Sequence, residues 1–275
     1  MNRLKAATGL ATMFVCGAAA AQSAGERIAV PLTDPTRPAT VHVPIVQGSI
    51  TIRGVDRKDL LIQVRAGDDD SGDSRRKSDS SGLKRIQQPA SLSVEEENNQ
   101  VRVSAGMPSD TYDLNIEVPL KTNLEISTVN GGEITVEGVD GDLEVGNVNG
   151  GITLTRVGGS VVAHTTNGDV KVSLARVTPQ KPMAFTTLNG DVDITFPVAT
   201  RANLKLRSER GEILTDFDLK MTADGSAPKI EDTRQSGGRY RIEVNKVLSA
   251  TINGGGPDFE LRSFTGNIYL RSTGK

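Results

Sequence analysis

The most regular pattern of apolar and polar positions in this chain is a nine-residue repeat between residues 132 and 172. Each unit holds a glycine, an aliphatic residue two positions later, and a small or aliphatic residue two positions after that. Apolar residues two apart lie on one face of a β-strand, and the polar residues between them lie on the other. Five units follow in register, which predicts short strands that stack to bury their apolar faces. The repeat glycines are Gly132, Gly141, Gly150, Gly159 and Gly168, and Gly190 begins a later unit of the same kind.

Two further features complete the unit. The seventh position after the glycine is apolar or small, and Val139, Val148, Val157 and Thr166 occupy it. The glycine follows Asn, Asp or Gly, and it tolerates the positive φ that a tight turn requires. Each unit therefore predicts one short strand and one corner.

A second period, twice as long as the first, predicts how the strands stack. The Asn-Gly pair returns at every second unit, and Asp-Gly or Gly-Gly occupies the corners between. We therefore expect two nine-residue units per coil of a flattened solenoid. One internal ladder would consist of Ile134, Ile152 and Val170, and the opposite one of Leu143 and Val161. Asn149, Asn167 and Asn189 would stack along one edge, where side-chain amides can bond from coil to coil.

Looser copies of the unit occur before and after this core, so the pattern covers most of the chain. The predicted fold class is all-β, a parallel β-helix or β-solenoid with about two nine-residue units per coil. Two polar stretches without apolar periodicity, residues 66–89 and 223–239, are expected to be loops. We expect a single solenoid domain over residues 41–275, preceded by an N-terminal extension at 22–40.

Residues 1–21 have the organisation of a cleaved signal peptide. Arg3 and Lys5 precede a short apolar stretch, and small residues follow it. The predicted cleavage lies between Ala21 and Gln22, with cleavage after Ala24 as the alternative. The apolar stretch is shorter than the roughly 20 residues of a membrane-spanning helix, so no transmembrane segment is expected in the mature chain. The protein is therefore expected to be exported, to the periplasm, the outer surface or the medium.

Composition narrows the classes of function. Cys16 is the only cysteine and lies inside the predicted signal peptide, so no disulfide or thiolate chemistry is expected in the mature chain. Loss of Arg3 and Lys5 reduces 32 basic residues to 30 against 34 acidic ones, a net charge of −4. Nucleic-acid-binding proteins usually carry a basic face. We therefore expect no nucleic acid as a partner.

Paired carboxylates offer one enzymatic alternative, a polysaccharide-acting β-helix enzyme. Asp140 with Asp142 and Asp191 with Asp193 are the pairs that could serve as acid and base. However, an aspartate recurs directly after the repeat glycine, which indicates turn chemistry. The expectation is that the protein is not an enzyme and has no catalytic residue.

Metal and nucleophile motifs are weak. The segment Asn253–Asp258 only approximates a calcium-binding glycine repeat, because a proline precedes its aspartate. His42 and His164 are the two histidines, and neither belongs to a zinc motif. A Ser160–His164 nucleophile pair has no supporting motif around the serine. We expect the protein to bind neither a metal ion nor a cofactor. We also expect the His164 side chain to be exposed on the surface.

The string from Leu114 to Gly131, followed by Gly-Asp-Leu-Glu-Val-type repeats, resembles the bacterial putative-adhesin family of β-strand-repeat domains. The resemblance covers roughly residues 41–275 and is best between Asp113 and Phe196. It implies a parallel β-helix-like fold and a place in the cell envelope, and it brings no catalytic residues. Together with the solenoid pattern, it favours a non-enzymatic, adhesin-like binding or scaffolding module. Its partner would be an unidentified protein or glycan of the envelope or cell surface.

Overall fold

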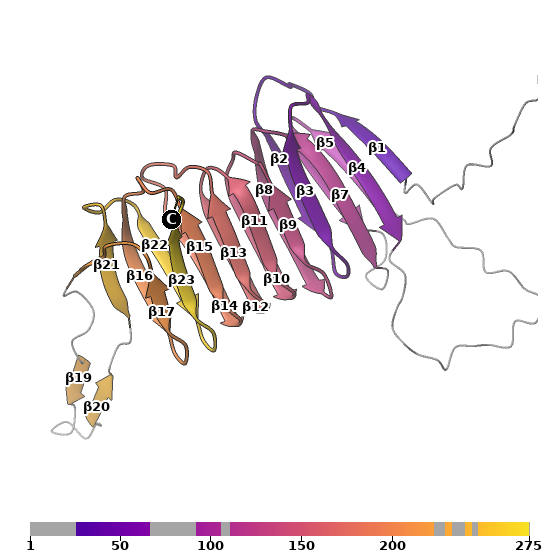
Figure 1. Ribbon diagram of the computed structural model, residues 1–275. Coiled ribbons are helices and arrows are strands. Elements are labelled where there is room, and N and C mark those ends of the chain that lie inside the picture. Colours follow the sequence, from indigo (N-terminus) through magenta and orange to yellow (C-terminus); the bar gives the residue numbers. More distant parts are fainter. Residues whose placement is uncertain are drawn as a thin grey trace, which may run out of the picture.

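The structure is a computed structural model that describes residues 26–66, 92–105, 111–222, 229–232, 240–243 and 247–274. These residues form strands and turns and no helix, and most strands belong to two large sheets (Figure 1). Nothing in these ranges is a helix of the length and hydrophobicity that a membrane crossing needs. The predicted signal peptide, its cleavage point at Ala21 and Gln22, and nearly all of the predicted loop at 66–89 lie outside the described residues.

The strand order of each sheet differs from the order along the chain. Among the described residues, ten strands form the first sheet, in the order β1 (Glu26–Pro31), β4 (Asp59–Ala66), β7 (Tyr112–Pro119), β3 (Ile50–Val55), β9 (Ile134–Glu137), β11 (Ile152–Val157), β13 (Val170–Leu174), β15 (Val192–Phe196), β23 (Ile268–Ser272) and β17 (Ile213–Thr215). Eleven form the second sheet, in the order β18 (Lys220–Met221), β21 (Leu248–Ile252), β16 (Ala202–Ser208), β22 (Asp258–Ser263), β14 (Met183–Asn189), β12 (Val161–Asn167), β10 (Leu143–Asn149), β8 (Thr122–Asn130), β2 (Ala39–Pro44), β6 (Gln100–Ala105) and β5 (Leu92–Glu97). Strands β19 (Lys229–Asp232) and β20 (Tyr240–Glu243) form a separate antiparallel pair, and β19 lies within the stretch 223–239 that the sequence predicts as a loop.

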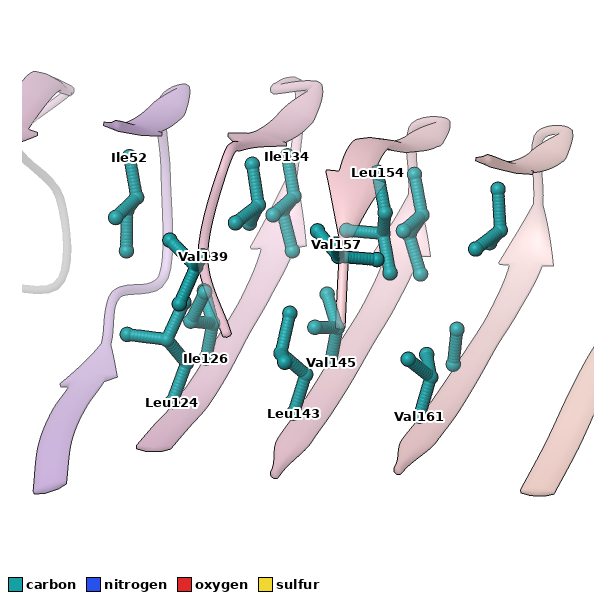
Figure 2. Packing of buried hydrophobic residues seen from close by; sticks show 14 of the residues in the cluster. Ile52, Leu124, Ile126, Ile134, Val139, Leu143, Val145, Leu154, Val157 and Val161 are labelled. Atoms are coloured by element: carbon teal, nitrogen blue, oxygen red, sulfur yellow. The ribbon is translucent and has the colours of Figure 1, made fainter. Parts of the chain in front are cut away.

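The centre of the molecule consists of coils that follow one another in the chain. Strands β9, β11 and β13 are parallel neighbours, and Ile134, Ile152 and Val170 pair at the interval of two repeat units. In the second sheet Leu143 pairs with Val161 at the same interval. Both predicted ladders are therefore confirmed, and their side chains are buried between the facing sheets (Figure 2).

The interval between paired residues is longer outside this stretch. Leu124 pairs with Leu143, one position beyond the length of two units, and Val170 pairs with Val192, four positions beyond it. The additional residues lie in the connections, such as residues 175–182 between β13 and β14. The two sheets enclose one hydrophobic core and remain open at their ends. The fold is thus a β-solenoid-like stack of two mostly parallel sheets.

Close approach between coils, more than turn conformation, requires glycine at the corners. Gly159, Gly168 and Gly190 have the positive φ that the sequence predicts, whereas Gly132 and Gly141 do not. A Cβ atom at Gly132 would lie 1.7 Å from the Gly48 carbonyl oxygen, and one at Gly150 would lie 2.1 Å from that of Gly132. Successive corners therefore touch backbone to backbone, and any side chain there would separate the coils.

The first end of the stack contains an intercalated strand pair. Strands β7 and β8 are consecutive in the chain, but β3 lies between β7 and β9, and β2 lies between β6 and β8. The pair β2–β3, which comes early in the chain, is thus inserted between two coils made later. Strand β1, within the predicted extension at 22–40, pairs antiparallel with β4 at the edge of the first sheet.

The other end repeats this arrangement with the last strands of the chain. Strand β22 lies between β14 and β16, and β23 lies between β15 and β17 (Figure 1). Aromatic packing holds the inserted pair. The rings of Phe196 and Phe259 stack with centroids 5.5 Å apart, and Phe185 meets Phe196 edge to face at 6.4 Å. All three side chains are fully buried.

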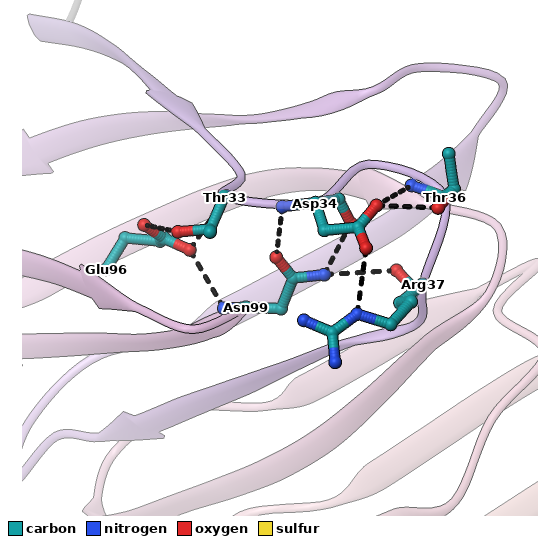
Figure 3. Close-up of polar contacts among 6 residues, drawn as sticks. All are labelled: Thr33, Asp34, Thr36, Arg37, Glu96 and Asn99. Atoms are coloured by element: carbon teal, nitrogen blue, oxygen red, sulfur yellow. Dashed lines mark hydrogen bonds and ion pairs between the residues drawn. The ribbon is translucent and has the colours of Figure 1, made fainter.

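A polar network fastens the loop between β1 and β2 to the turn between β5 and β6 (Figure 3). The Asn99 side chain accepts a hydrogen bond from the Asp34 N–H and donates to the carbonyls of Asp34 and Arg37. The Glu96 carboxylate accepts from the backbone N–H groups of Thr33 and Asn99, which lower its pKa below the usual 4.5. Because a charged carboxylate accepts these bonds more strongly than a protonated one, the strength of the fastening depends on pH.

Candidate functional site

The corners at the ends of six second-sheet strands, β8, β10, β12, β14, β22 and β16, repeat one arrangement. A buried or half-buried hydroxyl or amide on the strand donates a hydrogen bond to a glycine carbonyl of the neighbouring coil, which satisfies a backbone acceptor that the corner leaves unpaired. The donor–acceptor pairs are Thr128–Gly48 (3.5 Å), Asn147–Gly132 (2.8 Å), Thr165–Gly150 (2.9 Å), Thr187–Gly168 (2.8 Å), Ser263–Gly190 (2.9 Å) and Ser208–Gly266 (2.9 Å).

The asparagines two residues further on form a second line of bonds. Each side-chain amide donates to the side-chain Oδ1 atom of the asparagine on the preceding coil. Asn149 donates to Asn130 at 3.1 Å, Asn167 donates to Asn149 at 2.8 Å, and Asn189 donates to Asn167 at 2.8 Å. Because the amides are exposed to solvent, these bonds contribute little to the free energy of folding. Their main effect is to hold the edge of the stack rigid. The two ladders hold these corners in one regular line.

An exposed apolar row lies between these two ladders. It consists of the residues that precede the asparagines, with their counterparts on the flanking coils, and five of these side chains are large, apolar and 37–46 % exposed. We call this set the corner row; its members are Val46, Val129, Val148, Thr166, Leu188 and Phe264. Core packing does not explain five exposed apolar side chains in one row, which only the half-buried Thr166 interrupts. Such a patch is typical of a contact surface.

A hollow of about 520 Å³ lies beside the corner row on the outer face of the second sheet. We call it the sheet groove. Gly146 lines it and is buried beneath the His164 ring: a Cβ atom on Gly146 would lie 2.8 Å from His164 Cε1 and Nε2. The remaining lining residues are His42, Glu125, Ile126, Ser127, Thr128, Val129, Glu144, Asn147, Val148 and Thr166. The glycine thus removes one outward side chain where its neighbours would otherwise fill the face.

The groove brings both histidines together with two carboxylates. His42 Nδ1 lies 3.1 Å from Glu125 Oε2, and Glu125 is paired in register with Glu144 on the next strand. Like charges on directly paired residues of neighbouring strands repel each other. The described residues contain no group of three or more side chains arranged to hold a metal ion. The groove therefore suits a cationic group with an apolar neighbour.

The predicted catalytic pairs take part in other contacts. Asp140 forms an ion pair with Arg176, and the Lys181 amine donates to Asp142 at 2.7 Å. Asp193 pairs with Arg271 at 2.9 Å. None of these aspartates lines the sheet groove.

Two aspartates that directly follow a repeat glycine accept a backbone N–H from the next coil. Asp169 accepts the Asp191 N–H at 2.9 Å, and Asp191 accepts the Asn267 N–H at 2.7 Å. The bond from Asp191 lowers the pKa of Asp169. Turn chemistry thus accounts for the recurring aspartate. Ser160 and His164 do not form the nucleophile pair considered from the sequence, since the Ser160 hydroxyl donates to the Pro182 carbonyl instead.

Sequence reasoning located both histidines but not the groove. His42 and Glu125 are 83 residues apart and meet only because β2 is inserted beside β8. The corner row had a visible signal, an apolar residue before Asn-Gly at Val129 and Val148. Val148 occupies the same repeat position as the buried Val139 and Val157, so the pattern alone does not separate the outward position from the inward one.

The fold and its corner ladders define a β-solenoid-like domain of stacked parallel strands. The sequence model of the Toastrack DUF4097 family matches residues 40–247, and the chain belongs to that family. The resemblance to a putative-adhesin domain of unknown function is thereby confirmed. No curated protein matches the chain.

Two solved structures are similar to this chain. One is a putative cell adhesion protein from Clostridium sporogenes, with 9 % identity and a TM-score of 0.42 over 90 % of this chain and 100 % of that one. The other is a putative adhesin from Bacteroides fragilis, with 11 % identity and a TM-score of 0.33 over 91 % of this chain and 98 % of that one.

Proposed function

We propose that this protein is an exported, non-enzymatic binding module of the cell envelope, with the sheet groove and the corner row as its contact surface. The observation that carries the proposal is a line of exposed apolar side chains beside a hollow that holds Glu125 and Glu144. Exposed apolar area provides affinity when a partner covers it, and charge beside it selects the partner.

The chemistry of the surface favours a protein partner. No Phe, Tyr or Trp lines the groove, so the groove offers no aromatic platform on which a sugar ring could stack. Phe264 is the one aromatic residue of the corner row, and the Arg210 guanidinium lies over its ring, 5.3 Å from the centroid. Two neighbouring carboxylates attract a lysine or arginine side chain, and Val129 and Val148 would pack against apolar residues beside it. The proposed partner is thus a segment with a basic residue flanked by apolar ones.

The surface is preformed. Its side chains project from paired strands and from the laddered corners, so few backbone torsions remain to be ordered when a partner binds.

Export is the second element of the proposal, and it is supported by the signal-peptide pattern of residues 1–21. N-terminal sequencing of the protein from the envelope fraction is expected to begin at Gln22.

The experiment is a capture assay with residues 22–275 immobilised and presented with envelope proteins of the source cells. Captured proteins are cross-linked, and the cross-linked positions are mapped. The groove variants are Val129→Thr with Val148→Thr, and Glu125→Gln with Glu144→Gln. Leu120→Thr is the matched control, because Leu120 is similarly exposed but lies outside the groove.

We expect cross-links at the groove, loss of capture in both groove variants and full capture by the control. Capture that persists in both groove variants would overturn the proposed surface. Release of shortened sugar fragments from envelope polysaccharide by the purified protein would overturn the non-enzymatic assignment.

A further inference from the structure

A second hollow, of about 550 Å³, lies at the opposite corner of the stack, where first-sheet strands pass into second-sheet strands. Three connections enclose it: residues 175–182 after β13, residues 197–201 after β15, and residues 253–257 before β22. We call it the arginine pocket. It exists because β22 is inserted between β14 and β16, which brings the third connection against the first two.

The walls of the pocket are held in place by hydrogen bonds. The Asn253 side-chain amide donates to the carbonyls of Val198 at 3.0 Å and Thr200 at 2.8 Å. The Asn203 amide donates to the Gly256 carbonyl at 2.7 Å. The first two bonds tie the 253–257 connection to the 197–201 connection, and the third ties it to β16. The shape of the pocket is therefore set before any ligand enters.

The lining of the pocket is mostly apolar, and its only charged residues are two arginines. The apolar walls consist of Ala175, Val177, Pro179, Pro197, Ala199 and Pro257. Arg176 and Arg201 supply the charge, and no lining residue is acidic. Arg176 is already paired with Asp140. Arg201 has no ion pair or side-chain hydrogen bond with the rest of the described chain.

The wall of the pocket holds one further polar group. Thr200 lines the pocket and is 4 % exposed, and its Oγ1 atom has no hydrogen-bond partner among the described residues. A buried polar atom without a partner is costly in free energy, and native structures keep few of them. Because this atom is closed to solvent, it lies behind the surface of the pocket, and it is not one of the groups that would meet a ligand there.

We propose that the arginine pocket binds a small amphiphilic carboxylate, a single acyl chain with a free carboxyl group. The chain would pack on the proline, alanine and valine walls, and the carboxylate would lie on the planar guanidinium of Arg201, which matches it with two parallel donors. The volume lies within the range of about 300–1,000 Å³ that small-ligand pockets show. The assignment is independent of the sheet groove, which lies on the outer face of the second sheet and shares no lining residue with this pocket.

The test uses decanoate as the probe and residues 22–275 as the protein, with binding measured by calorimetry and by amide chemical shifts. Decylammonium has the same chain with the opposite charge. We expect decanoate to bind, to shift the three connections, and to bind at least about tenfold more tightly than decylammonium. Arg201→Ala is expected to weaken decanoate binding by about tenfold or more, and Arg201→Lys by less.

Two more variants complete the design. Arg53→Ala removes an exposed arginine on the first sheet and is expected to leave decanoate binding unchanged. Ala199→Trp fills the pocket and is expected to abolish binding; since the chain has no tryptophan, its fluorescence reports that the fold is retained. Equal binding of the two probes, unchanged binding by Arg201→Ala, or no binding of decanoate at millimolar concentration would overturn the proposal.

Discussion

The centre of the molecule and its two ends are built from the same strand pattern but assembled by different rules. In the centre, from β8 to β15, each coil lies against the coil that follows it in the chain. At each end a strand pair from near a terminus is inserted between two coils that are consecutive in sequence. Repetition therefore defines neighbours in the centre, and long-range pairing defines them at the ends.

The difference has a functional consequence. The sheet groove needs His42 from the inserted strand β2 beside Glu125 of β8, and the arginine pocket needs the connection that leads into the inserted strand β22. A simple repeat presents the same residue types in every coil. Insertion places side chains of different origin next to each other, and both hollows occur at these junctions.

The largest expected effect is on the centre. Ile152→Asp places a carboxylate in the middle of the buried ladder, where no partner is available, and should lower the free energy of unfolding by more than about 4 kcal/mol. Urea unfolding measures the change. Thr135→Asp, at an outward position of the same sheet, is the control and should change stability by less than about 1 kcal/mol. Similar stability of Ile152→Asp and wild type would contradict the assignment of inward positions.

The next largest effect is expected at the end of the stack that contains the inserted strands β22 and β23. Phe259→Ala removes the ring that stacks on Phe196 and should cost about 3–5 kcal/mol. Amide hydrogen exchange should show faster opening of β22, β23 and their neighbours than of β9 to β13. Phe264→Ala, which removes an exposed ring next to the same strand, is the control and should leave exchange at β22 nearly unchanged. Uniform loss of protection would mean that the inserted pair is no separate unit.

A smaller effect is expected at the corner ladder. Thr187→Val keeps the shape of the side chain but leaves the Gly168 carbonyl without its donor, at a cost of about 1–3 kcal/mol. The control is Thr186→Val, which alters the outward neighbour. Thermal unfolding distinguishes the two. Equal melting temperatures for both variants would show that the buried hydroxyls contribute no more than surface ones.

The smallest effect concerns the first end in acid. The lowered pKa of Glu96 means that the folded state binds a proton less readily than the unfolded chain. Its contribution to stability is complete above the ordinary pKa near 4.5 and is lost as pH falls through the lowered value. Hydrogen exchange of β5 and β6 should therefore accelerate in this window before that of β10 and β12.

Glu96→Gln should produce the same acceleration at neutral pH, because it removes the charged acceptor of the Thr33 and Asn99 bonds. Glu97→Gln, at an exposed position on the same strand, should not. Faster exchange at the central strands first would contradict the assignment of this network as the fastening of the first end.

The sequence was sufficient to predict the parts that depend on neighbours in the chain. Ile134, Ile152 and Val170 follow from spacing alone, because alternation selects the inward face and the period selects the partner. It was insufficient for the ends, because β2 and β22 carry the same alternating pattern as every other strand, and that pattern is compatible with any position in the stack. The buried rings of Phe185, Phe196 and Phe259 were the available signal, and they could be interpreted only once their contacts were known.

Engineered disulfides test the inserted strand pair most directly. Residues 22–275 contain no cysteine, so the only thiols are those introduced. Ala184 and Glu260 are paired in register on β14 and β22, and Glu260 is also paired with Lys205 on β16. Adjacent strands are about 4.8 Å apart, whereas a disulfide cannot join Cα atoms more than about 7 Å apart. The account predicts that Ala184→Cys with Glu260→Cys forms a disulfide and that Ala184→Cys with Lys205→Cys does not; the reverse result would contradict it.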